Sequence, residues 1–276
     1  MHFVYQIYYD EKSQRALDPG FIPLSNVENK RPDWYELWVI KNFLEKTDLI
    51  DDAWYGFLSS KFKDKTSLQA RDVYEFLETI DSCADVITTS FSWEQIAYFL
   101  NPFEQGNVFH PGLTKISQQF FDSIGLKIDL AKLVGYSGNS VFCNYIIAKP
   151  VYWRKWLELA TVLFDFVENG ERSGNNSPAR ELSGTTSYGS VRYQTPMKTF
   201  VQERLPSVIL AQNRFRTRVL DTSHVLHLFE RLFDEHPRTR RLLHACDTLK
   251  REYLESGDPK VLDSYWKVRS LIPKKF

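Results

Sequence analysis

Lysines and hydroxyls crowd together directly after a short apolar run near the amino terminus. The apolar residues 53–58 are followed by Ser59, and then by Lys61, Lys63 and Lys65 at alternate positions. An extended backbone would direct all three ammonium groups to one side. Three cations with neighbouring hydroxyls suit a pyrophosphate. The alternative is that these lysines simply close a strand and keep it soluble.

A second chemical pair is Glu203 followed by Arg204, which comes soon after the Gly/Ser/Asn-rich stretch 169–192. A carboxylate at the start of a helix beside a long loop could take a proton from an acceptor hydroxyl. We therefore consider Glu203 and Arg204 as catalytic candidates. A buried ion pair that joins a helix to the sheet explains the same two residues equally well.

Polar residues interrupt or end two further apolar runs. Asn144 lies inside the apolar stretch 141–148, and Lys149 ends it. Because a buried amide must be hydrogen-bonded, Asn144 contacts either a sugar hydroxyl or a backbone group. We include Lys149 among the candidate binding residues.

The end of the first apolar run offers another candidate contact. Tyr8 and Tyr9 end that run, and Asp10 follows them. This placement suits contact with a nucleotide base or ribose.

Other kinds of site lack their sequence signatures. The chain has neither Gly-rich phosphate fingerprint, no CxxC pair and no nucleophile elbow. Asp51 and Asp52 precede their strand, so they are poorly placed for a metal–diphosphate site, and no metal ligand is predicted. A hydrolase of phosphorylated metabolites would need a nucleophile or a metal set that the sequence does not show.

The elements that must position these residues alternate between strand and helix. Apolar and β-branched runs predict strands at 3–9, 51–61, 84–89 and 141–148. Helical spacing predicts helices at 34–44, 70–80 with Ser67 as N-cap, 93–100, two segments within 113–133, 152–167, and from 223 onward. The segment 196–212 is predicted as an entry strand or turn followed by a helix, interrupted at Pro206. Residues 18–23 and 169–192 are predicted as loops. The order predicts an α/β fold with a mixed central sheet flanked by helices.

Composition narrows the class of protein. The formal net charge of zero does not favour nucleic acid as a partner. Residues 214–276 carry a net charge of +5, so this basic helical tail either touches anionic lipid or an acidic partner, or is a solvated surface. Three cysteines without metal-site spacing indicate a reducing compartment. With no apolar run of the ~18–20 residues that span a bilayer, we expect a cytoplasmic protein.

Four blocks in order resemble a family of uncharacterised glycosyltransferase-like proteins from bacterial capsule and O-antigen clusters. They begin with the aromatic strand from Asp52 to Ser59, followed by an aspartate-led strand at 84–87. The segment 143–149 with the helix start at 153–157 comes next, and Glu203-Arg204-Leu205 is last. The resemblance covers roughly residues 3–212. It implies a GT-A-like nucleotide-sugar domain over 1–213, with 214–276 as a basic helical extension.

The resemblance also implies roles for particular residues. Glu203 would serve sugar transfer, and Asn144 would contact the donor or the acceptor. No Asp-x-Asp motif follows a strand, so the resemblance does not extend to a divalent metal cofactor.

Together, these observations predict a glycosyltransferase that moves a sugar from a nucleotide-diphospho-sugar to a surface-polysaccharide or lipid-linked acceptor. Lysines would replace the metal at the diphosphate. The basic tail would hold the enzyme near the inner membrane. The alternative is a non-catalytic carbohydrate- or nucleotide-binding module on the same fold.

Overall fold

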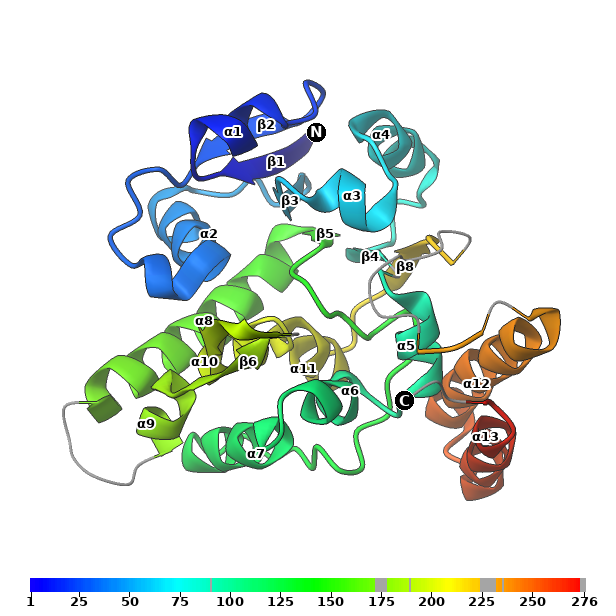
Figure 1. Ribbon diagram of the computed structural model, residues 1–276. Helices are drawn as coiled ribbons and strands as arrows, with labels where there is room; N and C mark the ends of the chain where they lie inside the picture. Colours follow the sequence, from blue (N-terminus) through cyan, green and yellow to red (C-terminus); the bar gives the residue numbers. More distant parts are fainter. Residues whose placement is uncertain (90, 172–177, 189, 224–231, 235, 274–276) are drawn as a thin grey trace.

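The protein is built around a mixed β-sheet (Figure 1). A computed structural model describes the chain except for residues 90, 172–177, 189, 224–231, 235 and 274–276. Within the described ranges, six strands form the sheet in the order β2-β1-β3-β5-β4-β8. Their bounds are β1 His2–Tyr8, β2 Ile22–Ser25, β3 Trp54–Ser59, β4 Val86–Thr89, β5 Ile146–Ala148 and β8 Thr217–Leu220. The predicted α/β class with a mixed sheet flanked by helices is confirmed.

One strand of the sheet runs against the others. β1 is parallel to β2 and β3, and β4 is parallel to β8, whereas β5 is antiparallel to both β3 and β4. The carboxyl ends of the five like-directed strands therefore share one edge with the amino end of β5. We call this edge the carboxyl edge of the sheet.

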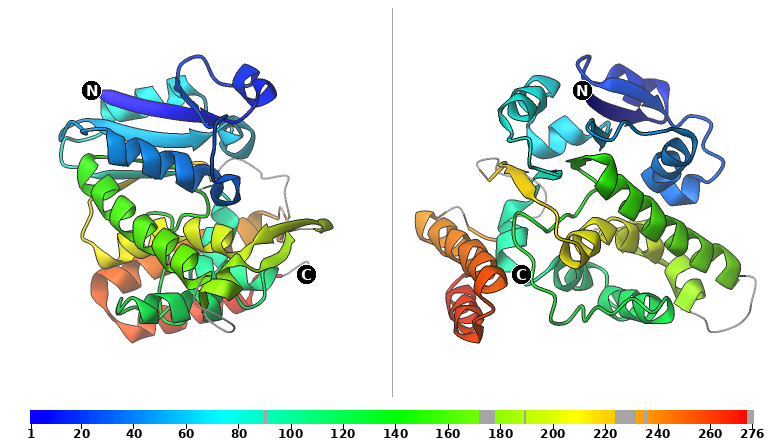
Figure 2. Two further views of the ribbon diagram at one scale, coloured as in Figure 1. Left: turned by 90° about the vertical axis from the view of Figure 1, so that its left-hand side faces the viewer. Right: turned by 180° about the vertical axis from the view of Figure 1, so that it is seen from behind.

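Helices cover both faces of the sheet and form a lower layer away from β1 (Figures 1 and 2). In the first half of the chain they are α1 Glu11–Arg15, the 3-10 turn Pro32–Trp34, α2 Tyr35–Lys46, α3 Phe62–Thr66, α4 Ala70–Thr79, α5 Trp93–Tyr98, α6 Pro102–Phe109 and α7 Leu113–Ser123. In the second half they are α8 Pro150–Glu171, α9 Pro178–Ser183, α10 Met197–Gln202, α11 Leu205–Gln212, α12 Pro237–Ser256 and α13 Pro259–Ser270. A two-stranded antiparallel hairpin, β6 Thr185–Tyr188 and β7 Ser190–Pro196, precedes α10.

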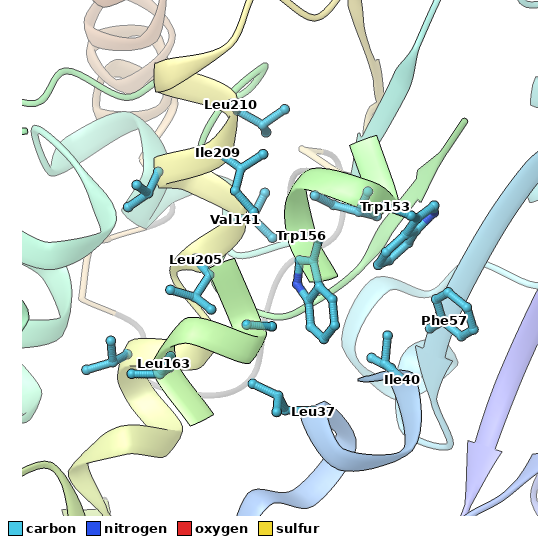
Figure 3. Close-up of a cluster of buried hydrophobic side chains, with 14 of the residues drawn as sticks. Leu37, Ile40, Phe57, Val141, Trp153, Trp156, Leu163, Leu205, Ile209 and Leu210 are labelled. Atoms are coloured by element: carbon cyan, nitrogen blue, oxygen red, sulfur yellow. The ribbon is translucent and has the colours of Figure 1, made fainter. Parts of the chain in front are cut away.

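The two faces of β3 belong to separate hydrophobic clusters, because successive side chains of a strand point to opposite faces of the sheet. Phe57 packs in a cluster with α2, α8, α10 and α11, while Leu58 packs in another with α3 and α4. Figure 3 shows the first cluster, in which Trp153 of α8 meets Phe57. Their ring centroids are 4.8 Å apart at 90°, and the Trp153 indole donates to the Tyr55 carbonyl at 2.9 Å. The tryptophan thereby fixes α8 on the sheet.

The last two helices dock on α5 rather than on the sheet. Lys250 of α12 is fully buried and donates to the carbonyls of Ile96 at 2.5 Å and Phe99 at 2.7 Å. Burial lowers the pKa of Lys250 to about 8. The carbonyls at the end of α5, which lack helical partners, are thus satisfied by the ammonium group. None of the helices within the described ranges combines the length and the apolarity that crossing a bilayer requires.

Several local predictions need correction. The residues predicted as loop at 22–23 belong to β2, where Pro23 is tolerated because β2 is an edge strand. The stretch 169–192 contains α9 and β6, and residues 172–177 and 189 lie outside the described residues. The segment after Gly125 is not helical, α6 was not predicted, and Ser67 ends α3 instead of capping α4.

The carboxyl-terminal segment 214–276 also differs from its prediction as purely helical. It contributes β8, the strand that pairs with β4 at one side of the sheet. The predicted helix over residues 225–233 falls mostly outside the described residues, and Leu232 and Phe233 are not helical. Asp258 caps α13 by accepting from the Lys260 amide at 2.9 Å.

Gly56 in the middle of β3 yields a stability prediction. A Cβ there would lie 2.9 Å from Ile147 Cγ1 and 3.1 Å from Val4 Cγ1, and both neighbours belong to adjoining strands that cannot move apart independently. We expect Gly56→Ala to lower the free energy of unfolding by about 1–3 kcal/mol through overpacking. Urea denaturation at 25 °C checks this, and an unchanged midpoint would contradict it.

Candidate functional site

The carboxyl edge of the sheet gathers polar side chains from distant segments. Ser59 ends β3, and Tyr145 directly precedes β5. Their hydroxyl oxygens are 2.6 Å apart, which ties these two segments together. In α/β sheets, ligands bind beyond the carboxyl ends of the strands. This edge is therefore the candidate site.

Lys65 lies at the centre of this group. Its Nζ donates to Cys143 Sγ at 3.4 Å, and it lies 5.7 Å from the ring centroid of Tyr145 and 5.4 Å from that of Phe91. The neighbouring Cys143, followed by Tyr145, Glu203 and Glu36, raises the pKa of Lys65 against the effect of burial. A half-buried ammonium group that stays charged at neutral pH is thus held at the edge.

The other predicted lysines do not share this position equally. Lys61 precedes α3 as its N-cap, and Lys63 and Lys65 lie within the helix, so the prediction of an extended backbone is wrong. Residues four apart share a helix face, whereas residues two apart do not. Lys61 and Lys65 therefore lie on one side, and the exposed Lys63 lies on another.

The alternating lysines favour an extended backbone in the sequence, although this segment forms the short helix α3. Phe62 and Thr66 are both buried and four residues apart, and the Thr66 hydroxyl donates to the Phe62 carbonyl at 2.7 Å. That apolar spacing of four is the signal that would have indicated α3.

Glu203 is a half-buried carboxylate at the end of α10. It forms the C-cap of α10, and its side chain is 33% exposed. The pKa of Glu203 is raised to about 7, because burial, with a small contribution from Glu36, raises it more than the charges of Arg204 and Lys65 lower it. The positive charge of Lys65 thus favours the ionised form of Glu203, the residue predicted as the base.

Glu36 is a second carboxylate of the site, which the sequence did not single out. It lies half-buried in the first turn of α2. Burial raises the pKa of Glu36, while Lys65 and Lys61 lower it. Its place next to the lysines results from tertiary packing, and the only local hint is an acid in the first turn of a helix.

A partly buried ion cluster holds the start of α2 against α10. Lys198 of α10 lies 2.5 Å from Asp33 and 4.3 Å from the ring centroid of Trp34. Arg31 donates to Asp33 and, at 2.5 Å, to Glu168 of α8. Asp33 is three residues before Glu36, and Lys198 lies on α10, which Glu203 caps, so this cluster joins the two segments that carry the carboxylates.

Arg204 has structural partners. Its buried guanidinium donates to the Pro102 and Phe200 carbonyls, both at 2.8 Å, and to Gln105 at 2.7 Å. Its nearest approach to Glu203 is 3.9 Å. Arg204 therefore anchors the α10–α11 junction to α6, and its charge influences Glu203 from there.

Two buried amides offer hydrogen-bond acceptors. Asn144 lies between Cys143 and Tyr145, and its Oδ1 is buried with no hydrogen-bond partner. The same holds for Oε1 of Gln202, which precedes Glu203. A buried carbonyl oxygen without a donor is costly, so such atoms mark places where a ligand or water would bind.

The predicted nucleotide contacts at the first strand lie at the same edge. Tyr8 ends β1, and Tyr9 is half exposed just beyond it. The Asp10 carboxylate caps α1 by accepting from the Ser13 amide and hydroxyl, each at 2.6 Å, and these bonds lower its pKa. Asp10 therefore already has a structural role, with its side chain exposed to solvent.

Lys149 lies at the opposite edge of the sheet. It follows β5, which runs against its neighbours, so it comes close to Trp54 at the start of β3. Its Nζ donates to the Ser82 carbonyl at 2.9 Å. The structure thus separates Lys149 from the other predicted binding residues.

Two other features bear on what the site can hold. Among the residues that the structure describes, no group of three or more His, Cys, Asp or Glu side chains could hold a metal ion. A surface hollow between the end of α7, α8 and α11 is lined by residues such as Leu126, Leu159 and Val208, and contains none of the candidate residues.

Comparisons with known proteins do not assign this site. No family model matches the chain, and no curated protein or solved structure matches it.

The raised pKa of Glu203 predicts a pH-dependent stability. The folded protein holds this proton more tightly than the unfolded chain, so the stabilisation is present below pH ~4.5 and is lost as the pH rises through ~7. We expect Glu203→Gln to match the wild type at pH 4.5 and to be more stable by about 1–2 kcal/mol at pH 8.5, after allowing for solvent screening.

Chemical denaturation across this pH range measures the difference. Glu158→Gln, a change at an exposed carboxylate on α8, is the control and should show no such trend. A Glu203→Gln difference that does not vary with pH would show that the carboxyl titrates normally.

Proposed function

We propose that the protein is a glycosyltransferase that uses a nucleotide-diphospho-sugar and carries a GT-A-like fold. The observation that supports this most is the juxtaposition at the carboxyl edge of the charged Lys65 with Glu203, whose pKa is about 7. One group suits a phosphate and the other suits proton transfer. The mixed sheet flanked by helices agrees with such a fold.

Lys61 and Lys65 would bind the diphosphate of the donor. Charge-assisted hydrogen bonds from ammonium groups to phosphate oxygens are among the stronger polar contacts. As the bond between the anomeric carbon and the phosphate oxygen breaks, these two cations would stabilise the charge that develops on the leaving nucleoside diphosphate. The exposed Lys61 and the half-buried Lys65 can approach the diphosphate from one helix face.

Glu203 would serve as the general base. An acceptor hydroxyl attacks the anomeric carbon, and its proton passes to the Glu203 carboxylate. A pKa of about 7 suits this task, because the group is substantially ionised at neutral pH and still basic enough to take a proton. The unpartnered Asn144 oxygen could accept a hydrogen bond from a sugar hydroxyl.

The acceptor would be a growing surface polysaccharide or a lipid-linked glycan. The basic segment 214–276, which includes α12 and α13, could bring the enzyme to the cytoplasmic side of the inner membrane by contact with anionic lipid.

One observation favours the alternative of a non-catalytic binding module. Arg204, predicted as a catalytic partner of Glu203, is engaged by backbone carbonyls of α6 and α10. A module would bind nucleotide sugars without turning them over. Transfer of radiolabelled sugar to a glycan acceptor, measured beside binding, distinguishes the two functions.

The helical placement of the lysines makes a prediction about binding. We expect Lys61→Ala and Lys65→Met each to weaken binding of UDP-glucose or GDP-mannose about tenfold, because each removes a charge-assisted contact. Lys63→Ala is the matched control, since Lys63 lies on another side of the same helix. Isothermal titration calorimetry measures all three.

The proposed diphosphate site would be wrong if Lys63→Ala weakened binding as much as the other two changes. It would also be wrong if none of the three changes affected binding of a nucleotide sugar that the wild type binds.

The proposed base makes a prediction about turnover. We expect Glu203→Gln to lower kcat by about 10²–10⁴-fold, the usual contribution of a general base, with donor affinity within about threefold of the wild type. The wild-type kcat should rise with pH through about 7 and then level off, as Glu203 ionises. Normal turnover in Glu203→Gln would exclude this role.

A further inference from the structure

Tyr35, the first residue of α2, has a strained backbone. Its φ is 46° and its ψ is −127°. This combination belongs to the mirror image of the β region, which glycine adopts freely and residues with a Cβ rarely adopt. Ser67 and Ser92 also have a positive φ, but their ψ values of 8° and 45° lie in or near the left-handed helical region. Tyr35 therefore carries a conformational cost that a glycine would avoid.

Hydrogen bonds on both sides of Tyr35 hold this conformation. The Tyr35 amide donates to the Pro32 carbonyl and closes the 3-10 turn. The Tyr35 carbonyl accepts from the side-chain amides of Asn26 at 3.5 Å and Asn29 at 3.4 Å. The preceding Trp34 is fully buried in the hydrophobic cluster of α2 and α8. The chain thus turns sharply between a buried ring and an exposed one.

The packing of the fold does not account for the side chain of Tyr35. The side chain is 44% exposed. Among the residues that the structure describes, none stacks on the Tyr35 ring and none forms a hydrogen bond with its hydroxyl. A glycine would close the same turn without the strain. Strain of this kind is typical of sites where the placement of a side chain serves a ligand.

A second exposed tyrosine lies close to Tyr35 at the carboxyl edge of the sheet. Asn26 directly follows β2, and its backbone amide donates to the Tyr8 carbonyl at the end of β1 at 2.7 Å. The side chain of the same Asn26 donates to Tyr35. Tyr9 follows Tyr8 and is 50% exposed. Asn26 therefore joins the two segments that carry these exposed phenol rings.

Two exposed phenol rings suit a flat aromatic ligand. A tyrosine ring offers a large and rigid apolar face, on which nucleobases stack without regard to their identity. In a nucleotide-sugar donor the base is the flat aromatic part, whereas the diphosphate and the sugar present oxygen atoms. The rings of Tyr9 and Tyr35 also lie beyond the carboxyl ends of β1 and β2, where α/β sheets bind such ligands.

We propose that the nucleobase of the donor stacks on the ring of Tyr35, beside Tyr9, and that the strained backbone holds this ring outward. The inference rests on the proposed function, because it concerns the base of the nucleotide donor. It assigns Tyr35 as a binding residue.

Three substitutions at this position separate the ring from the strain. Tyr35→Phe retains both, Tyr35→Ala removes the ring and retains the Cβ that causes the strain, and Tyr35→Gly removes the ring and the strain. Trp266→Ala, which removes an exposed ring on α13, is the control. Isothermal titration calorimetry with UDP and with GDP measures binding, and urea denaturation without ligand measures stability.

Binding should follow the ring, and stability should follow the strain. For the nucleotide that the wild type binds, we expect Tyr35→Ala and Tyr35→Gly each to weaken binding about tenfold. Tyr35→Phe and Trp266→Ala should bind it as tightly as the wild type. Tyr35→Gly should unfold at a higher urea concentration than both the wild type and Tyr35→Ala, because relief of strain outweighs the added freedom of glycine in the unfolded chain.

The outcomes distinguish this inference from the proposed function. Unchanged nucleotide binding in Tyr35→Ala, or a loss in Tyr35→Phe as large as that in Tyr35→Ala, would overturn the inference and leave the proposed function standing. A Tyr35→Gly protein no more stable than Tyr35→Ala would also overturn it, because the backbone would then carry no strain. If no nucleotide or nucleotide sugar binds to the folded wild type, the proposed function fails and the inference fails with it.

Discussion

The reversed direction of β5 is the constraint on which the candidate site depends. Because β5 runs antiparallel to β3 and β4, the chain enters the sheet at the edge where its neighbours end. Cys143, Asn144 and Tyr145 are therefore brought to the carboxyl edge, beside Lys65 and Ser59. A parallel strand in this place would have carried Lys149 to that edge instead. The direction of one three-residue strand thus decides whether a buried amide and a thiol, or an ammonium group, lies at the carboxyl edge.

The candidate site contains a carboxyl group with a raised pKa and buried polar atoms without hydrogen-bond partners. Asn144 and Gln202 each bury an oxygen without a donor, and Glu203 is neutral in part of the population at pH 7. Each of these features costs stability, and such costs are typical of functional sites. The hydrophobic clusters on both faces of β3, with Trp153 and Trp156 fully buried, offset them.

The sequence predicted the elements with strong apolar patterns better than it predicted the site. The aromatic run of β3 and the long apolar face of α8 are unambiguous, because burial on a sheet or along a helix imposes a period on many residues. β8 has four residues and only Leu220 is buried, so no period was available to detect it. The prediction of an extended backbone at residues 61–65 was wrong, because it was based on the alternating lysines and not on the helical spacing of the buried Phe62 and Thr66.

Glu36 and Lys198 show why the rest of the site was out of reach. Each looks like an ordinary polar residue at a helix end, and their importance comes from which helices pack together. The four-charge cluster around Asp33 joins residues 31–33 to residues 168 and 198, and no local pattern encodes such a contact. Prediction from one sequence therefore located Lys65, Glu203 and Asn144 as chemical candidates without the geometry that relates them.

The pairing of β4 with β8 has a consequence for how the protein folds. The Arg216 amide donates to Asp85, which lies 131 residues earlier, and Ser59 meets Tyr145 across 86 residues. Closing such long loops costs entropy before the contacts compensate for it, so sheets built from distant segments fold slowly. Until residues 217–220 arrive, one side of β4 is an open strand edge, the kind of surface on which chains aggregate. Assembly of the carboxyl edge thus requires distant segments to meet, and β4 keeps an open side until β8 pairs with it.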